Sequence, residues 1–283
     1  MTVLTTRIWP VAHGRALALG ETGRLMAIVN VTPDSFSDGG EHAVAASAVE
    51  HALSCVGEGA DILDIGGEST RPGADPVSAA QEQDRVLPVI EALAARTDAL
   101  ISIDTYRAET ARLAIAAGAH IVNDVWAAQK EPELATVCAE AGAGLCLMHT
   151  GRNRERLADV IADQRLFLDR SLAITDAAGV SRERIVLDPG FGFAKETPQA
   201  NLELMARSDE MAVFGLPLLA GTSRKRFLGN VTGRDAKDRD VATAATTALL
   251  RMKGFAIFRV HNVAINRDAL AMADAMLAFQ TKP

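Results

Sequence analysis

Short apolar segments recur along the chain, and each is followed by a longer segment with the spacing of an amphipathic helix. Val, Ile and Leu dominate the short segments without clean alternation, which is typical of strands that are covered on both faces. We expect strands at residues 25–30, 61–66, 100–104, 120–124, 144–149, 184–188, 216–221 and 256–261. The pattern therefore predicts a sheet of buried, parallel strands.

Helical spacing is clearest in three of the intervening segments. Residues 79–95 carry apolar side chains on one helical face, at Val86, Val89, Ile90 and Leu93. Residues 235–253 and 262–279 are rich in alanine, the strongest helix former. Strands that alternate with helices in this way indicate an α/β fold.

Eight strands with helices between them predict a (β/α)8 TIM barrel. A doubly wound sheet is the alternative, but it usually carries a glycine-rich turn after its first strand, and none follows residues 25–30. Residues 7–20 predict a short N-terminal β-hairpin at the barrel bottom. Because no linker, repeat or low-complexity segment interrupts the pattern, we expect residues 1–283 to form a single domain.

Polar or unusual residues follow every predicted strand. In chain order they are Asn30, residues 66–73 (GGESTRPG), Asp104, Asn123 with Asp124, Met148 with His149, Asp188 with residues 189–195 (PGFGFAK), residues 221–226 (GTSRKR), and Arg259 with His261. In a TIM barrel the active site lies at the carboxyl ends of the strands. The sequence therefore predicts one site built from all of these ends.

The strand ends carry two kinds of chemistry. Asp104, Asn123 and Asp188 offer hydrogen-bond acceptors, which suit a flat ligand with several N–H groups on one edge, such as a 2-amino-4-oxo-pyrimidine. A cationic group suits phosphate oxygens and consists of Arg71, Lys225, Arg259 and His261. We expect a site with acceptors deeper in the barrel and positive charge at its rim.

Each of these residues also has an ordinary structural interpretation. Asp104 and Asn123 could cap the helices that follow them, and Asp188 before Pro189 could start a turn. Arg259 could form a surface ion pair, and His120 and His149 are expected to be structural. His261 favours function more strongly, because Arg259 lies two residues earlier and shares its side of the strand.

Composition narrows the class of protein. The 283 residues have a formal net charge of −7 and are 48% hydrophobic, which fits a globular domain and argues against a nucleic-acid binder. Cys55, Cys138 and Cys146 form no close pair, so we expect a reducing, cytoplasmic location. No apolar stretch approaches the roughly 20 residues of a membrane span, and no secretory signal is recognisable. Dinucleotide, calcium and zinc motifs are also lacking.

With these residues in place, the chain resembles the bacterial dihydropteroate synthases. The resemblance is carried by NVTPDSFSDGG (30–40), GGESTRPG (66–73), SIDT (102–105), IVND (121–124), LDPGFGFAK (187–195), SRK (223–225) and RVH (259–261). It implies a barrel that is homodimeric and condenses 6-hydroxymethyl-7,8-dihydropterin diphosphate with 4-aminobenzoate, using Mg²⁺. It also implies that sulfonamides inhibit the enzyme.

The resemblance assigns roles to residues of this chain. The pterin would be held by Asp104, Asn123 and Asp188, with Met148 beneath the ring, Lys225 beside it, and Thr70 and Arg71 from the second loop. Arg259, His261 and, through Mg²⁺, Asn30 would hold the diphosphate. The aminobenzoate would lie among Phe36, Ser69, Pro72, Phe193 and the Lys225 stem, with its carboxylate near Ser223. Phe36 would ride on a loop that closes as a lid.

Two departures from the usual family pattern stand out. Many bacterial relatives continue after the Met-His pair with Met-Gln-Gly-x-Pro, whereas this chain has residues 150–154 as TGRNR. Asn262 stands where Asp is common, and we expect it to start the last helix.

A pterin-binding methyltransferase module is the alternative function. It would share the acceptors but would not need the cations of residues 223–225 and 259–261.

Overall fold

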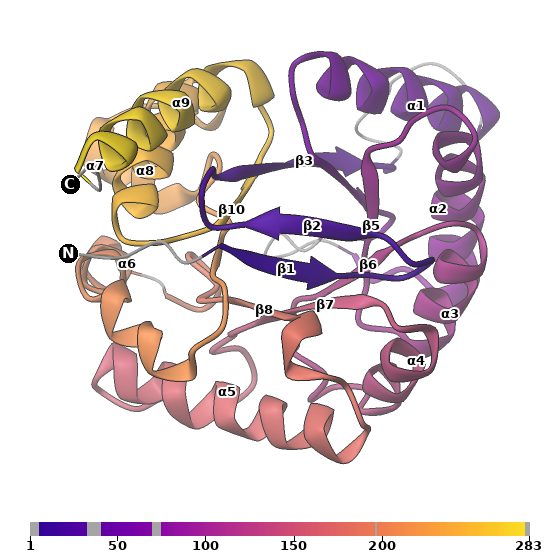
Figure 1. The fold of residues 1–283 in the computed structure, drawn as a ribbon, viewed down its shortest axis with the longest axis horizontal. Helices are drawn as coiled ribbons and strands as arrows, with labels where there is room; N and C mark the ends of the chain where they lie inside the picture. Colours follow the sequence, from indigo (N-terminus) through magenta and orange to yellow (C-terminus); the bar gives the residue numbers. More distant parts are fainter. Residues whose placement is uncertain (1–5, 33–40, 70–74, 196, 281–283) are drawn as a thin grey trace.

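The computed structural model describes residues 6–32, 41–69, 75–195 and 197–280. Its main sheet has eight parallel strands in the order β8-β7-β6-β5-β4-β3-β10-β9. They are β3 (Arg24–Asn30), β4 (Ile62–Gly66), β5 (Leu100–Asp104), β6 (Ile121–Asp124), β7 (Gly144–Met148), β8 (Ile185–Asp188), β9 (Leu219–Ala220) and β10 (Ile257–Val260). An isolated bridge between Leu187 and Leu218 joins the two edges, so the predicted barrel is confirmed (Figure 1).

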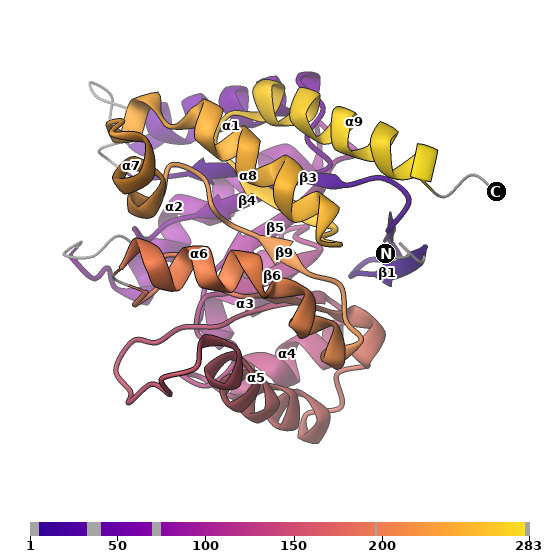
Figure 2. The ribbon, with the colours of Figure 1, turned by 90° about the vertical axis from the view of Figure 1, so that its left-hand side faces the viewer.

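Helices surround this barrel on its outer side (Figures 1 and 2). They are α1 (Glu41–Gly57), α2 (Ala79–Ala94), α3 (Ala108–Ala116), α4 (Glu133–Ala141), α5 (Val160–Ala177), α6 (Pro198–Ala206), α7 (Arg226–Thr232), α8 (Asp240–Met252) and α9 (Val263–Gln280). Short 3-10 helices cover Arg182–Arg184, Ser208–Phe214 and Ala236–Asp238. None of the helices in the described part of the chain is long and apolar enough to cross a membrane.

Two predicted elements are shorter than expected. The strand predicted at 216–221 contains only Leu219–Ala220, because Pro217 has no N–H to donate and the preceding ladder is limited to the Leu218 bridge. The helix predicted at 235–253 begins only at Asp240, after a separate 3-10 turn. Elsewhere, hydrophobic spacing located the strands to within one or two residues.

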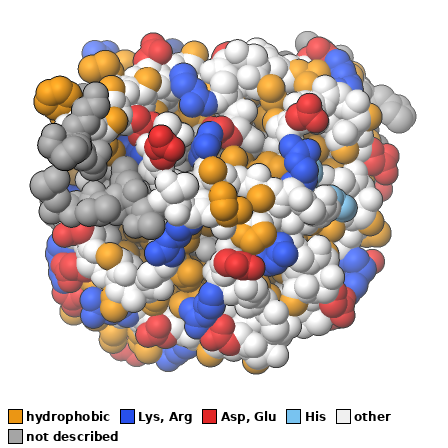
Figure 3. Space-filling view, in the orientation of Figure 1, with side chains coloured by type: hydrophobic (Ala, Val, Ile, Leu, Met, Phe, Trp, Pro, Cys, Tyr) orange, Lys and Arg blue, Asp and Glu red, His pale blue; other side chains and the backbone are white. Residues whose placement is uncertain are grey.

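The N-terminal hairpin closes one end of the barrel. Its strands β1 (Arg7–Pro10) and β2 (Ala16–Leu19) are antiparallel and lie across the end where the barrel strands begin (Figure 1). Trp9 packs on interior residues such as Met26 and Ile62, and its indole N–H donates to the Arg184 carbonyl at 2.8 Å. The predicted hairpin at the barrel bottom is confirmed. On the face of the molecule that carries the hairpin, acidic and basic side chains are interspersed (Figure 3).

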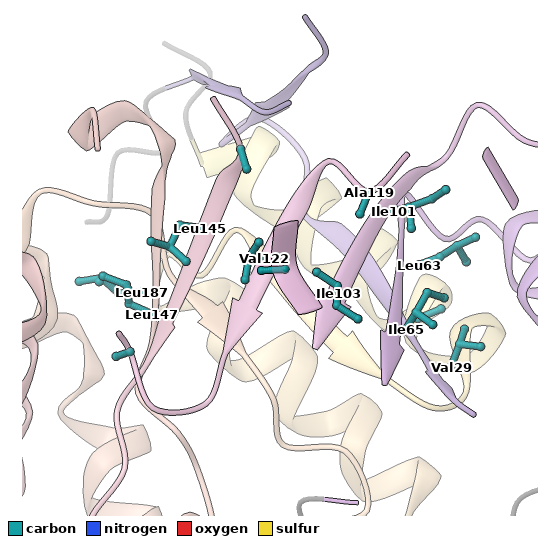
Figure 4. Close-up of a cluster of buried hydrophobic side chains, with 14 of the residues drawn as sticks. Val29, Leu63, Ile65, Ile101, Ile103, Ala119, Val122, Leu145, Leu147 and Leu187 are labelled. Atoms are coloured by element: carbon teal, nitrogen blue, oxygen red, sulfur yellow. The ribbon is translucent and has the colours of Figure 1, made fainter. Parts of the chain in front are cut away.

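Alternation along the strands separates two kinds of buried position. Outward residues such as Leu63, Ile103 and Val122 pack beneath the helices (Figure 4). The inward residues near the bottom are also apolar, and include Met26, Ile62, Leu100, Ile121, Cys146, Val186 and Ile257. Two residues further along the same strands, the inward positions are Ile28, Asp64, Ser102, Asn123, Met148, Asp188 and Arg259. The barrel interior therefore changes from largely apolar to largely polar towards its carboxyl end.

Candidate active site

A cavity of about 1300 Å³ opens at the carboxyl end of the barrel. Every described residue to which the resemblance assigns a role lines it, namely Asn30, Ser69, Asp104, Asn123, Met148, Asp188, Phe193, Ser223, Lys225, Arg259 and His261, whereas Asp124 and His149, at the same strand ends, do not. The remaining predicted residues, Phe36, Thr70, Arg71 and Pro72, lie outside the described residues. Strand ends that are far apart in the sequence thus contribute to one cavity, as expected for a TIM barrel.

Arg259 connects the acceptors to the cationic group. Its Nε donates to Asp64 Oδ2 at 2.6 Å and its Nη2 donates to Asp104 Oδ2 at 2.7 Å. The surface ion-pair interpretation of Arg259 is therefore wrong, since its side chain is only 20% exposed and bridges the fully buried Asp64 carboxylate and the largely buried carboxylate of Asp104. Burial raises the pKa of Asp104, and Arg259 opposes that rise. Burial also disfavours the charge on Arg259, but Asp64 and Asp104 hold its pKa above the ordinary value.

Asp64 is a site residue that the sequence reasoning missed. It is fully buried, and its Oδ2 accepts from Asn123 Nδ2 at 3.0 Å as well as from Arg259. With its nitrogen bound in this way, the Asn123 amide can offer its oxygen to a ligand. Asp64 Oδ1 has no hydrogen-bond partner within the described ranges. The available signal was a charged residue at an inward position of an otherwise apolar strand.

Helix capping does not explain Asp104 or Asn123. The N-cap of α3 is Arg107, without a side-chain cap, while Asp104 is bound to Arg259. The turn after β6 is held by Asp124, which accepts from Trp126 N at 2.7 Å and Ala128 N at 2.6 Å. The capping interpretations are wrong because both side chains point inward, and Asp124, one residue on, points the other way.

Asp188 combines a turn with the cavity. Its Oδ1 accepts from Gly190 N at 2.7 Å, which confirms the turn interpretation for one oxygen, while the residue also lines the cavity. Burial raises the pKa of Asp188, and the Lys225 ammonium opposes this. Asp188 is therefore an acceptor within reach of positive charge.

The side chain of Lys225 lies against residues 191–193, in the loop that follows β8. Its Nζ lies 4.0 Å from the ring centroid of Phe193 and donates to the Phe191 carbonyl. A Cβ on Gly192 would lie 2.7 Å from Lys225 Cδ, and Gly192 has φ +78°, so glycine is needed there. Burial lowers the pKa of Lys225 to about 7, against the influence of Asp188. The guanidinium of Arg152 also lies 4.7 Å from the Phe193 ring centroid.

Ser223 and His261 form a hydrogen-bonded pair at the cavity wall. The backbone N–H of His261 donates to Ser223 Oγ at 3.1 Å, and Oγ lies 2.9 Å from His261 Nδ1. These two contacts hold the imidazole of His261 at the cavity wall.

The atypical segment at 150–154 has a defined arrangement. Arg154 Nη2 donates to Asp163 Oδ2 at 2.6 Å and its Nε donates to the Thr150 carbonyl at 2.9 Å, while Arg152 lines the cavity. Asn262 accepts from Ile265 N at 3.2 Å, so the expectation that it starts the last helix is confirmed. The site therefore keeps Met148 despite the change that follows it.

His120 and His149, the two histidines expected to be structural, are buried in the fold. His120 lies near the barrel bottom, where its Nδ1 accepts from Ile101 N at 3.1 Å. His149 contacts Asp163 and the buried ammonium of Lys195. Neither lines the cavity, in agreement with the structural interpretation of both.

Within the described ranges no group of three His, Cys, Asp or Glu residues could hold a metal ion. Asn30 nevertheless places an amide side chain in the cavity, near the acceptors. Mg²⁺ keeps several waters and is often held by one or two protein oxygens together with substrate phosphates. The donor set fits Mg²⁺ only in this form, as an ion held mainly by a bound phosphate group.

Comparisons with known proteins agree with this geometry. Residues 26–261 match the family model described as pterin binding enzyme. The dihydropteroate synthase of Streptococcus pyogenes serotype M3 is 47% identical over 256 residues, covering 89% of this chain and 95% of that protein.

Two solved structures are similar over nearly their whole length. The Xanthomonas albilineans dihydropteroate synthase with 4-aminobenzoic acid has a TM-score of 0.89 and 42% identity, over 97% of this chain and 100% of that one. The Clostridium difficile dihydropteroate synthase, solved in the presence of pteroic acid, has a TM-score of 0.88 and 42% identity, over 91% and 98%. The chain therefore belongs to the dihydropteroate synthase family of pterin binding enzymes, and it is a transferase.

Proposed function

We propose that the enzyme condenses 6-hydroxymethyl-7,8-dihydropterin diphosphate with 4-aminobenzoate, giving 7,8-dihydropteroate and diphosphate. The observation that carries the proposal is the meeting of buried acceptors and cations in one cavity at the carboxyl end of the barrel. Relatives solved with 4-aminobenzoic acid and with pteroic acid support the same pair of substrates. The reaction transfers a dihydropterin-methyl group to an aromatic amine.

The pterin edge would bind at the bottom of the cavity. Asp104, Asn123 and Asp188 offer acceptor oxygens there, and Met148 supplies an apolar contact beneath the ring. Asp64 supports this arrangement by binding the amide nitrogen of Asn123. A ligand that brings N–H donors compensates the cost of burying these carboxylates. Thr70 and Arg71 are assigned to the pterin side by the resemblance alone.

The diphosphate would bind at Lys225, Arg259 and His261. Arg259 Nη2 is bound to Asp104, so the guanidinium is oriented before the substrate arrives. The His261 imidazole, held by its contact with Ser223, lines the same cavity. Mg²⁺, held by Asn30 and the diphosphate oxygens, would supply additional charge neutralisation of the leaving group.

The aminobenzoate would lie over the pterin, against Phe193 and the apolar stem of Lys225. Both side chains line the cavity, as does Ser69. Ser223 is the proposed neighbour of the carboxylate, and Phe36 and Pro72 would complete the apolar enclosure. Because sulfonamides carry the same para-substituted aniline ring as aminobenzoate, we also propose that they compete for this position.

Catalysis would depend chiefly on electrostatics. The bond between the pterin methylene carbon and the diphosphate oxygen breaks before or during attack by the aniline nitrogen, and the electron pair leaves with the diphosphate. Lys225, Arg259 and His261 stabilise the charge on the leaving group, while Asp104 and Asp188 hold the pterin as it becomes electron-poor. The aniline is neutral at pH 7, so its lone pair is available without a strong base. The proton is lost from the nitrogen after the new C–N bond forms.

We propose that the enzyme is a homodimer. Exposed apolar side chains follow one face of α8 at Val241 and Leu249, and one face of α9 at Met272, Met276 and Phe279. The two helices lie side by side (Figure 2). A second copy of the chain on this surface would bury side chains that are otherwise 48–78% exposed.

We also propose that the enzyme works in the cytoplasm. Its three cysteines, Cys55, Cys138 and Cys146, are buried free thiols. Burial raises the pKa of the Cys55 thiol to about 11, which disfavours the reactive thiolate. Such thiols suit a reducing compartment.

The test is product analysis with purified protein. The protein is incubated with the pterin diphosphate, labelled 4-aminobenzoate and Mg²⁺, and the products are separated and identified. We expect labelled dihydropteroate and an equal amount of diphosphate. A parallel incubation with methyltetrahydrofolate and a cobalamin acceptor tests the methyltransferase alternative, which predicts methyl transfer there and no dihydropteroate in the first reaction.

A further inference from the structure

Lys195 is a buried lysine that the proposed reaction does not use. It lies between β8 and α6 and is 7% exposed, at the edge of the cavity. Its Nζ donates to the Gly190 carbonyl at 2.7 Å and lies 3.1 Å from His149 Nδ1. Burying a lysine costs free energy unless its amine is hydrogen-bonded, and these two contacts offset part of that cost.

A chain of side chains fixes the far side of His149. Asp163 Oδ2 lies 3.0 Å from His149 Nε2, and both Asp163 oxygens accept from Arg154, at 2.8 and 2.6 Å. Burial lowers the pKa of His149 to about 4, so the ring is neutral near pH 7. Its Nε2 lies 3.0 Å from Asp163 Oδ2 and 2.8 Å from Arg154 Nη2, and its Nδ1 faces Lys195 Nζ. The ring beside Lys195 is therefore held in place from the fifth loop.

The Gly190 peptide, to which Lys195 is bound, joins two parts of the proposed site. Gly190 N donates to Asp188 Oδ1 at 2.7 Å, and the Gly190 carbonyl also accepts from Phe193 N at 3.1 Å. Gly190 has φ +65°, and a Cβ there would lie 1.9 Å from the His149 carbonyl oxygen. One tightly packed turn thus sets the positions of both an acceptor and an aromatic wall residue.

We propose that Lys195 is a positioning residue of the synthase reaction. By donating to the Gly190 carbonyl, with His149 Nδ1 beside it, it holds the turn that directs Asp188 towards the pterin and Phe193 towards the aminobenzoate. The inference rests on the proposed function, because those are the substrates that the turn would serve. Lys195 itself acts through the backbone and is not assigned to the reacting atoms.

Hydrogen bonding rather than charge is the property that matters for this role. Burial lowers the pKa of Lys195 to about 7, and Lys225 acts in the same direction while Asp188 and Asp163 oppose it. Arg154 adds a further positive charge, and the ring of His149, whose own pKa is lowered to about 4, faces Lys195. A neutral amine still donates to the Gly190 carbonyl. A neutral donor should therefore replace Lys195 in part, whereas an apolar side chain should not.

Lys195→Met and Lys195→Gln separate these properties. In Lys195→Met we expect the KM values for both substrates to rise by about tenfold or more, with a smaller change in kcat. Lys195→Gln keeps a donor on a chain one bond shorter, and we expect it to recover part of the loss. The inhibition constant of inorganic diphosphate should rise much less than the KM values in both variants, because Arg259 lies on β10 and His261 directly after it, outside the turn that Lys195 holds.

A matched control is Arg251→Met. Arg251 is also a fully buried cation that donates to backbone carbonyls and a carboxylate, but its partners are Gly20, Phe255 and Asp274, away from the cavity. We expect it to lower the unfolding midpoint without changing either KM. If Arg251→Met does not fold, Asp274→Asn replaces it.

Three results would overturn the inference. The first is wild-type KM values in Lys195→Met. The second is a Lys195→Gln enzyme no better than Lys195→Met, which would assign the effect to charge. The third is a rise in the diphosphate inhibition constant equal to that in KM. Failure of the wild-type enzyme to form dihydropteroate would instead refute the proposed function, so the two failures are distinguishable.

Discussion

Arg259 on β10 donates through Nη2 to Asp104 on β5 at 2.7 Å, inside the open end of the barrel. This contact joins the cationic group to the acceptors. Nε of the same guanidinium donates to Asp64 Oδ2 at 2.6 Å. The two kinds of chemistry are therefore parts of one hydrogen-bonded arrangement. Substitution of one member should disturb the others.

Asp64→Asn is the sharpest substitution in this arrangement. It keeps the shape of the side chain but leaves Arg259 with one carboxylate partner, so we expect kcat/KM to fall by about tenfold or more. Because one partner of a buried ion pair is lost, the free energy of unfolding should fall by about 3 kcal/mol. Steady-state kinetics and urea denaturation at pH 7 measure the two effects.

Asp61→Asn is the control for that prediction. Asp61 also pairs with an arginine, Arg24, at 3.1 Å and accepts from Leu25 N, but it lies at the opposite end of the strands. We expect a loss of stability without a loss of kcat/KM. Equal catalytic losses in both variants would contradict the role given to Asp64.

Substrate binding at pH 8 should take up protons. Burial lowers the pKa of Lys225 to about 7, so much of this amine is neutral at pH 8 in the free enzyme. A bound diphosphate favours the charged ammonium and raises its pKa, which draws a proton from solution. Calorimetric titrations in buffers of different ionisation enthalpy should show roughly 0.5–1 proton taken up per site. In Lys225→Met most of this uptake should disappear, and an unchanged uptake would assign the titration to another group.

The stability of the free enzyme should follow the same pKa. Between about pH 7 and 10 the unfolded chain binds more protons at Lys225 than the native state does, so the free energy of unfolding gains a contribution that rises with pH. Chemical denaturation of wild type and Lys225→Met over this range tests the sign. The stability advantage of the variant should shrink as the pH rises, and a growing advantage would be incompatible with a lowered pKa.

Activity should require Mg²⁺, and Asn30 should set its affinity. We expect EDTA to abolish turnover and added Mg²⁺ to restore it. Asn30→Ala removes one oxygen near the acceptors, and the Mg²⁺ concentration for half-maximal activity should rise by about tenfold or more. The measurement is a magnesium titration at saturating substrates. Full activity in EDTA would contradict the proposed use of the ion.

The dimer should depend on the apolar faces of α8 and α9. The double substitution of Leu249→Glu and Met272→Glu places charge on two side chains that are 58% and 73% exposed, so the chain itself should still fold. We expect sedimentation velocity to show a monomer where wild type shows a dimer. Val213→Glu, on an exposed residue of the 3-10 helix Ser208–Phe214, is the control and should leave the dimer unchanged.

Hydrophobic spacing predicted most of the fold because each barrel strand is covered by helices outside and by other strands' side chains inside. The segment around Leu219 was overestimated, since apolar content alone does not reveal that Pro217 lacks an N–H for the ladder. Cavity residues were recognisable at strand ends, where the chain leaves the barrel. The contacts among them come from distant strands and had no local signal.

Asp64 and Lys195 illustrate what the sequence could not provide. Asp64 lies two residues before a strand end, and its meaning depends on Asn123 and Arg259, which are 59 and 195 residues away. Lys195 was part of a recognised motif, but its partner His149 is 46 residues distant. The capping interpretation of Asp104 was equally reasonable from its neighbours. Only the closed barrel decides which way each side chain points.

The most direct test of the central claim is kcat/KM for dihydropteroate formation in Asp104→Ala and Lys225→Ala. One variant removes an acceptor and the other removes a cation from the same cavity. If that cavity is where the pterin diphosphate reacts, each value should be about 100-fold or more below wild type, with both proteins folded. Near-wild-type turnover in either variant would contradict the account.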